Sequence, residues 1–182
     1  MGMYRHLQKT WQSEEMKQIM KERMISWRRH EPVILRIERP TRLDRAHALG
    51  YKAKQGFVMA RVRIKKGTRK REKPSGGRKP GKQGMTSIPP KMNLQHIAEM
   101  RTARKFPNCE VIGSYYLAED GRQIWYEVIM VDPNHPAIKS TKSLKWLQNP
   151  SNRRRVFRGK TSAGRSSRGL RGHGKGYEKR LK

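Results

Sequence analysis

The sequence has few acidic residues, a single cysteine and no long apolar segment, and each of these features excludes a class of protein. Only 14 of the 182 residues are Asp or Glu, against 44 Lys and Arg. Cys109 stands alone, so neither an internal disulfide nor a cysteine pair for zinc is possible. No stretch of about 18 apolar residues is present to span a bilayer, and no apolar segment follows the first residues as a secretory signal would. We therefore expect a protein that works inside the cell and away from membranes.

Residue patterns for catalysis and cofactor binding are also missing. The stretch 76–83 nearly spells a phosphate-binding P-loop, but Gln83 replaces the Ser or Thr that binds magnesium. The glycine-rich stretch 172–176 lacks the helix and the acid that must follow a dinucleotide fingerprint. The six histidines are scattered singly, without the spacing of metal ligands. The acids Glu119 and Asp120 are expected in a solvated turn. We expect no catalytic, cofactor or metal site and no small-molecule substrate.

The net charge of +30 indicates that the chain binds an anionic partner. Self-repulsion of this size disfavours a compact chain standing alone, whereas nucleic acid offers closely spaced phosphates and releases counterions on binding. A run of like-charged residues usually marks only a solvent-exposed face of the protein. Residues 61–91 and 151–182, however, each include twelve Lys or Arg and only one Asp or Glu. Both stretches have too little apolar surface to offset the entropy of ordering. We predict two basic arms that stay disordered until nucleic acid folds them.

Helical spacing of apolar residues predicts several helices. One begins after Ser13, carries a Met and Trp stripe on one face, and ends before Pro32. An earlier turn at 4–11 shares that face, and the sequence leaves open whether the two are continuous. A short helix is expected at 42–49, and another begins after Asn93, a residue suited to capping a helix N-terminus.

Alternation of apolar and charged residues predicts strands. The pattern is clear at 57–65 and shorter at 33–37. Two further strands, 109–117 and 123–131, are rich in Val, Ile, Tyr and Trp, and the stretch 118–122 between them is expected to be a hairpin connection. Residues 106–132 hold five acidic residues and only one basic residue, so this hairpin region is the segment least suited to binding phosphate.

Five motifs resemble those of one known family. They are Met-Gly-Met-Tyr at 1–4, Arg-Pro-Thr-Arg at 39–42, Leu-Gly-Tyr-Lys-Ala-Lys-Gln-Gly at 49–56, Glu-Val-Ile-Met-Val-Asp-Pro at 127–133 and Thr-Ser-Ala-Gly-Arg-Ser-Ser-Arg-Gly-Leu at 161–170. In this order they resemble the archaeal and eukaryotic-type large-subunit ribosomal protein fifteen, the "e" type. Eukaryotic members run on further at the C-terminus, so the resemblance points to an archaeal member.

The resemblance implies an α+β fold with a small antiparallel four-stranded sheet packed with helices, an N-terminal helix and long basic irregular extensions. We divide the chain into an N-terminal helical segment (1–32), an α+β body (33–148) with a basic internal loop (65–91), and a Gly/Arg-rich extension (149–182). The implied function is that of a structural constituent of the large ribosomal subunit in the cytoplasm. Its expected partners are large-subunit ribosomal RNA and neighbouring ribosomal proteins.

The predicted RNA contacts come from the basic stretches and from the family likeness. Arg grips phosphate with a planar fork and can stack on bases, while Lys acts as a point charge. The likeness places Lys52, Lys54, Arg165 and Arg168 against RNA. The full predicted set is Arg39, Arg42, Tyr51, Lys52, Lys54, Arg61, Arg63, Lys65, Lys66, Arg69, Lys70, Arg71, Arg78, Lys79, Lys82, Arg153, Arg154, Arg155, Arg158, Lys160, Arg165, Arg168, Arg171, His173 and Lys175.

Aromatic residues in this basic context are candidates for stacking on unpaired bases. Besides Tyr51 they are Phe157 and Tyr177, together with Phe57 and Trp146, for which core packing is equally expected. Two alternatives stay open. The same charge would suit a general nucleic-acid-compacting protein, and, less favoured, an RNA-processing enzyme whose active site is not visible in the sequence.

Overall fold

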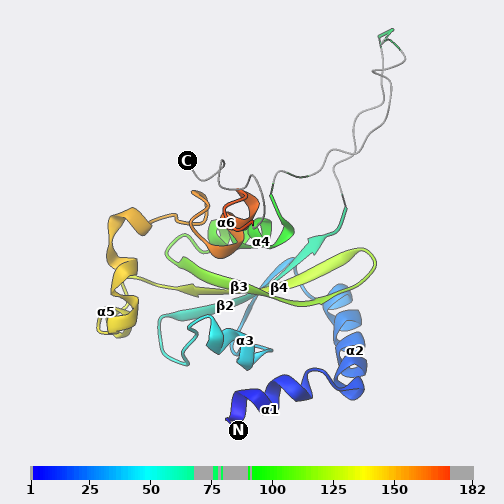
Figure 1. Ribbon diagram of the computed structural model, residues 1–182, viewed down its shortest axis with the longest axis horizontal. Coiled ribbons are helices and arrows are strands. Elements are labelled where there is room, and N and C mark those ends of the chain that lie inside the picture. Colours follow the sequence, from blue (N-terminus) through cyan, green and yellow to red (C-terminus); the bar gives the residue numbers. More distant parts are fainter. Residues whose placement is uncertain (1, 68–75, 78, 80–89, 91, 173–182) are drawn as a thin grey trace.

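The chain folds around one sheet with helices on both of its faces (Figure 1). A computed structural model describes residues 2–67, 76–77, 79, 90 and 92–172. The elements are α1 (Met3–Thr10), α2 (Glu14–His30), β1 (Ile34–Ile37), α3 (Leu43–Ala48), β2 (Phe57–Lys65), α4 (Leu94–Lys105), β3 (Glu110–Glu119), β4 (Gln123–Val131), α5 (Pro136–Lys139), the 3-10 helices η2 (Lys142–Gln148) and η3 (Pro150–Asn152), and α6 (Ser162–Ser167). The four strands pair antiparallel in the order β1-β2-β4-β3. This confirms the predicted α+β class.

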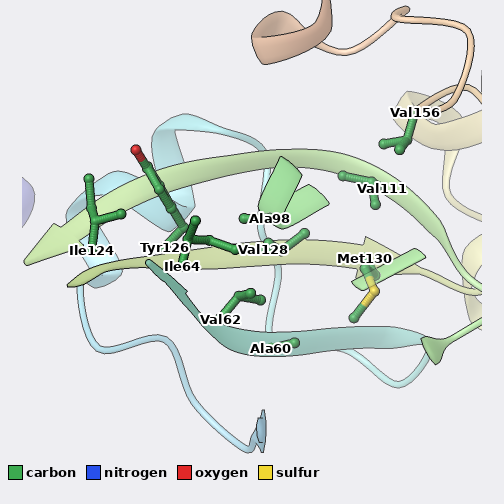
Figure 2. Close-up of a cluster of buried hydrophobic side chains, with 10 residues drawn as sticks. All are labelled: Ala60, Val62, Ile64, Ala98, Val111, Ile124, Tyr126, Val128, Met130 and Val156. Atoms are coloured by element: carbon green, nitrogen blue, oxygen red, sulfur yellow. The ribbon is translucent and has the colours of Figure 1, made fainter. Parts of the chain in front are cut away.

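Strand β4 lies inside the sheet and is buried on both faces from Ile124 to Val131. Side chains of a strand alternate between the two faces, so each face builds its own core. On one face Val62 and Val128 pack with Ala98 of α4 (Figure 2). The opposite face has three clusters: α2 covers one, α3 contributes to the second, and α5 and η2 pack against Val131 in the third; α2 and α3 lie below the sheet in Figure 1.

The N-terminal region consists of two helices, which answers the question that the sequence left open. The chain leaves the helical path at 11–13, and Ser13 Oγ accepts a 3.3 Å hydrogen bond from the Met16 amide at the start of α2. Such a side-chain cap satisfies an amide that has no partner within the helix. The helix ends at His30, ahead of Pro32, as predicted.

The predicted N-cap of α4 is confirmed, and the predicted bounds of α3 are confirmed to within one residue. Asn93 Oδ1 accepts a 2.7 Å hydrogen bond from the His96 amide at the start of α4. Helix α3 is one residue shorter at each end than expected, and Gly50 follows it with a φ of 90°. That backbone conformation is disfavoured for residues with a side chain, which explains the glycine.

The connection between β3 and β4 is shorter than predicted. Strand β3 continues through Glu119, so the expected connection 118–122 is wrong at its first two residues and only 120–122 lie outside the strands. Asp120 closes this loop because its Oδ1 accepts hydrogen bonds from the amides of Arg122 (2.7 Å) and Gln123 (2.6 Å). These bonds and Arg28 oppose the effect of burial and lower the pKa of Asp120.

The C-terminal basic stretch departs most from expectation. The composition of 151–182 predicted too little apolar surface for order without nucleic acid, but residues 151–172 include buried side chains, pack on α4 and β3 and contain helix α6. Val156 is only 1% exposed and joins the cluster that contains Val111 (Figure 2). In the first basic stretch, residues 61–65 belong to β2. The prediction that the basic arms are disordered without nucleic acid also covers most of 68–91 and all of 173–182, which lie outside the described residues.

Candidate nucleic-acid interface

The predicted RNA-binding residues fall into three groups by exposure. Those with exposed side chains are Arg39, Lys52, Lys54, Lys65, Lys79, Arg153, Arg154, Arg158, Arg165, Arg168 and Arg171. Those that are partly buried are Arg42, Arg61, Arg63, Lys66, Arg155 and Lys160, and Tyr51 is buried. Arg69, Lys70, Arg71, Arg78, Lys82, His173 and Lys175 lie outside the described residues. Exposure alone does not mark a cation without internal contacts, because the exposed Arg158 also donates to the carbonyls of Ser151 and Arg153.

Arg61 joins the N-terminal helix to the sheet. Its guanidinium donates two hydrogen bonds to Glu31, of 3.0 and 2.5 Å, and its central carbon lies 4.1 Å from the ring centroid of Trp27. Two parallel bonds between guanidinium and carboxylate form a strong pair. The neighbouring Arg63 donates a 2.7 Å bond to the carbonyl of Arg28, near the end of α2. Both side chains thus have structural contacts in the folded chain.

The hairpin acids are paired in a similar way. Glu119 lies 3.2 Å from Lys66 Nζ, and Asp120 lies 3.0 Å from Arg28. The acidic end of the hairpin is therefore largely compensated by internal cations. Since these carboxylates already face basic side chains, they contribute little repulsion toward an anionic partner.

Arg155 anchors the C-terminal segment rather than facing solvent. It donates to the carbonyls of Val111 (2.7 Å) and Ile112 (3.2 Å) in β3, and its guanidinium carbon lies 4.7 Å from the Trp146 ring centroid. Burial lowers the pKa of Arg155. Tyr51 likewise lies in a core cluster, where its ring meets Phe57 edge to face at 5.7 Å.

Helix α4 holds the same segment through polar side chains. Glu99, which is fully buried, accepts hydrogen bonds from Ser114 Oγ (2.6 Å) and Thr161 Oγ1 (2.5 Å), and burial raises the pKa of its carboxyl group. His96 Nε2 lies 3.0 Å from the Val156 carbonyl, and Asn93 Nδ2 donates to the Ala163 carbonyl at 3.3 Å. Buried polar groups with partners rigidify a packed region.

The segment 149–172 therefore directs its anchors inward and its charges outward. Val156, Thr161 and Ala163 are buried, whereas Arg153 and Arg165 are exposed. A rigid backbone that presents exposed guanidinium groups matches the requirements of phosphate binding.

Sequence reasoning missed several cations beside this segment. Arg104 and Lys105 end helix α4, and Lys139, Lys142 and Lys145 are exposed on α5 and η2. The Arg104 guanidinium carbon lies 5.9 Å from the ring of Phe157, which is 41% exposed. The three lysines between residues 139 and 145 were the only sign in the sequence of this cationic surface, and they form no recognisable motif.

Metal-ligand clusters and membrane-spanning helices are both absent from the described part of the chain. Within 2–67, 76–77, 79, 90 and 92–172, no three His, Cys, Asp or Glu side chains lie together in a way that would hold a metal ion. Among the same residues, no helix combines the length and apolar character needed to cross a membrane.

A small α+β body with a densely cationic surface is typical of components of ribonucleoprotein particles. The comparison with protein families agrees, because the family model described as Ribosomal L15, of the e type, matches residues 2–182. The chain belongs to this family. It is thus a structural protein of the large subunit of the cytoplasmic ribosome, and its family is not a family of enzymes.

Proposed function

We propose that this chain binds and stabilises folded large-subunit ribosomal RNA by neutralising phosphates where RNA helices approach one another. The observation that carries the proposal is the anchored segment 149–172, whose buried side chains fix the backbone while all of its arginines except Arg155 remain exposed. Double-stranded RNA presents mainly its shape, phosphates and 2′-hydroxyls to proteins. We therefore expect recognition of an RNA surface with little reading of sequence.

The proposal extends to other exposed cations of the predicted set. Arg39, Lys52 and Lys54 lie on the loops around α3, with exposed side chains. The cations of 69–82 and of 173–175 are assigned to RNA on their sequence alone, and their ordering on binding belongs to the same proposal. Neighbouring ribosomal proteins as further partners, and an archaeal origin, stay predictions.

The dependence of affinity on salt tests the proposal. The logarithm of the affinity falls with the logarithm of salt concentration by about 0.7 to 0.9 per neutralised phosphate. Replacing the three exposed arginines Arg153, Arg165 and Arg171 by Gln removes three charges from the segment. We expect the slope measured with large-subunit RNA to flatten by about two to three.

A matched control removes three charges elsewhere. Lys21, Arg23 and Arg29 are exposed on α2, outside the predicted interface, and their replacement by Gln gives the same change in net charge. We expect a clearly smaller effect on the slope. Equal flattening by both triple variants would show that net charge alone governs binding and would contradict a defined interface.

Competition with duplex DNA separates the proposal from general nucleic-acid compaction. A surface matched to folded RNA should prefer large-subunit RNA over duplex DNA of similar length at the same salt concentration. Equal affinity for the two polymers would favour compaction.

A further inference from the structure

A cavity of about 560 Å³ lies where the C-terminal segment meets the end of the sheet. Its walls come from Glu110 at the start of β3, Lys139 at the end of α5, Gln148 at the end of η2 and Arg153 in the anchored segment. The volume is within the range of about 300 to 1,000 Å³ that pockets for small ligands occupy. The cavity is large enough to receive a group from a partner.

The lining of this cavity combines apolar surface with side-chain amides. Pro107, Pro133 and Leu147 provide the apolar part. Asn108, Asn134 and Gln148 provide the amides, each of which has both donor and acceptor atoms. An unstacked nucleobase has this same combination of an apolar face and an edge with donors and acceptors.

Three cations complete the lining: Lys139, Arg153 and Arg154, all with exposed side chains. The one carboxylate in the wall, Glu110, already accepts a 2.7 Å hydrogen bond from the Arg154 amide. That bond holds Arg154 at a φ of 52°, in the left-handed region that few residues other than glycine adopt. The wall is therefore fixed in shape and positive in net charge.

We propose that this pocket receives one unstacked nucleotide of the ribosomal RNA, with its base on the apolar and amide lining and its phosphate against the cations. The inference rests on the proposed function and adds a defined binding site to it. A side chain of a neighbouring protein would also fit an apolar and amide wall. The three cations favour the nucleotide, because every nucleotide has a phosphate adjacent to its base.

Removing the amides without changing the charge tests the pocket. In the full-length chain, Asn134→Leu keeps the branched shape of the side chain and Gln148→Met keeps roughly its length, but both lose the hydrogen-bonding groups. With large-subunit RNA as the probe, we expect the double variant to bind about tenfold more weakly. The slope of affinity against salt should stay unchanged, since no charge is lost. The control variant carries Gln8→Met and Gln18→Met on the exposed surfaces of α1 and α2 and should bind like the unmodified chain.

Ultraviolet cross-linking of intact large subunits gives a second test that needs no variant. We expect mass spectrometry to find a nucleotide attached to the peptides that contain 107–110 or 133–148. Absence of a nucleotide on both, or chemical cross-links that connect Lys139 to another protein at this place, would overturn the inference.

Different results would contradict RNA binding by the chain and nucleotide binding by the pocket. A chain that does not bind large-subunit RNA contradicts the proposed function. A chain that binds RNA and responds to the loss of Arg153, Arg165 and Arg171, but whose amide double variant binds as tightly as the unmodified protein, contradicts the pocket alone.

Discussion

Thr161 Oγ1 donates a 2.5 Å hydrogen bond to Oε2 of the buried Glu99, and this bond joins the basic C-terminal segment to helix α4. The same hydroxyl oxygen accepts a 3.1 Å bond from the Gly164 amide and so caps α6. One side chain therefore both starts the local helix and attaches it to the body.

Replacing Thr161 by Val should destabilise the fold strongly. The change removes a helix cap and leaves a buried carboxylate oxygen without its donor. We expect the free energy of unfolding, measured by chemical denaturation, to fall by about 2 to 4 kcal/mol. The same substitution at Thr10, an exposed residue whose hydroxyl bonds only to the His6 carbonyl among the described residues, should change it by less than about 0.5 kcal/mol. Similar losses at the two positions would contradict the role of Thr161.

The close approach of two glycines gives a second prediction. A Cβ atom at Gly164 would lie 2.6 Å from the Cα atom of Gly159, so backbone blocks the space. Gly164→Ala should therefore lower the free energy of unfolding by at least about 1 to 3 kcal/mol, as overpacking does. Gly121→Ala is the control, because nothing lies within 4 Å of its added Cβ. A thermal melt in which both variants behave alike would contradict this packing.

The buried Glu127 gives a prediction about pH. Burial raises the pKa of Glu127 above its ordinary value of 4.5, although Thr41 and Tyr115 donate hydrogen bonds to it and Arg61 lies nearby. Between the unfolded and the folded pKa, the native state binds more protons than the unfolded state. Its contribution to stability is thus greatest at low pH and is lost as the pH rises from about 4.5 through the folded pKa.

The variant Glu127→Gln isolates this effect. The free energy of unfolding of the unmodified protein minus that of the variant should decrease as the pH rises over that window. The buried Glu99, whose pKa is also raised, is present in both proteins and cancels in the difference. A difference that grows with pH, or does not change, would contradict the direction of the shift.

The sheet and the main helices were predictable because their signals are local. Alternating residues at 57–65 gave β2, and Asn93 marked the start of α4. The antiparallel four-stranded sheet was implied by the family resemblance, whereas its strand order β1-β2-β4-β3 was not predicted. The break between α1 and α2 stayed open, since Ser13 can cap a helix or lie within one.

The anchored segment was not predictable from composition. The average composition of this segment is basic and glycine-rich. Its attachment to the body of the protein depends on a few residues, chiefly Val156 and Thr161, whose partners lie far away in the sequence. For the same reason, charge counts could not separate Arg155, which binds β3 carbonyls, from the exposed Arg153 and Arg154. The cavity beside them is formed by several separate segments, so no linear motif describes it.

Amide hydrogen exchange of the full-length protein without nucleic acid tests the central claim most directly. That claim is that residues 156–169 are fixed by their own contacts before RNA binds. The amides of Gly159, Arg165 and Arg168, which donate to backbone carbonyls within the segment, should exchange much more slowly than in an unstructured peptide. Exchange at the unstructured rate across this segment, with the sheet still protected, would show that RNA and not the protein body holds it in place.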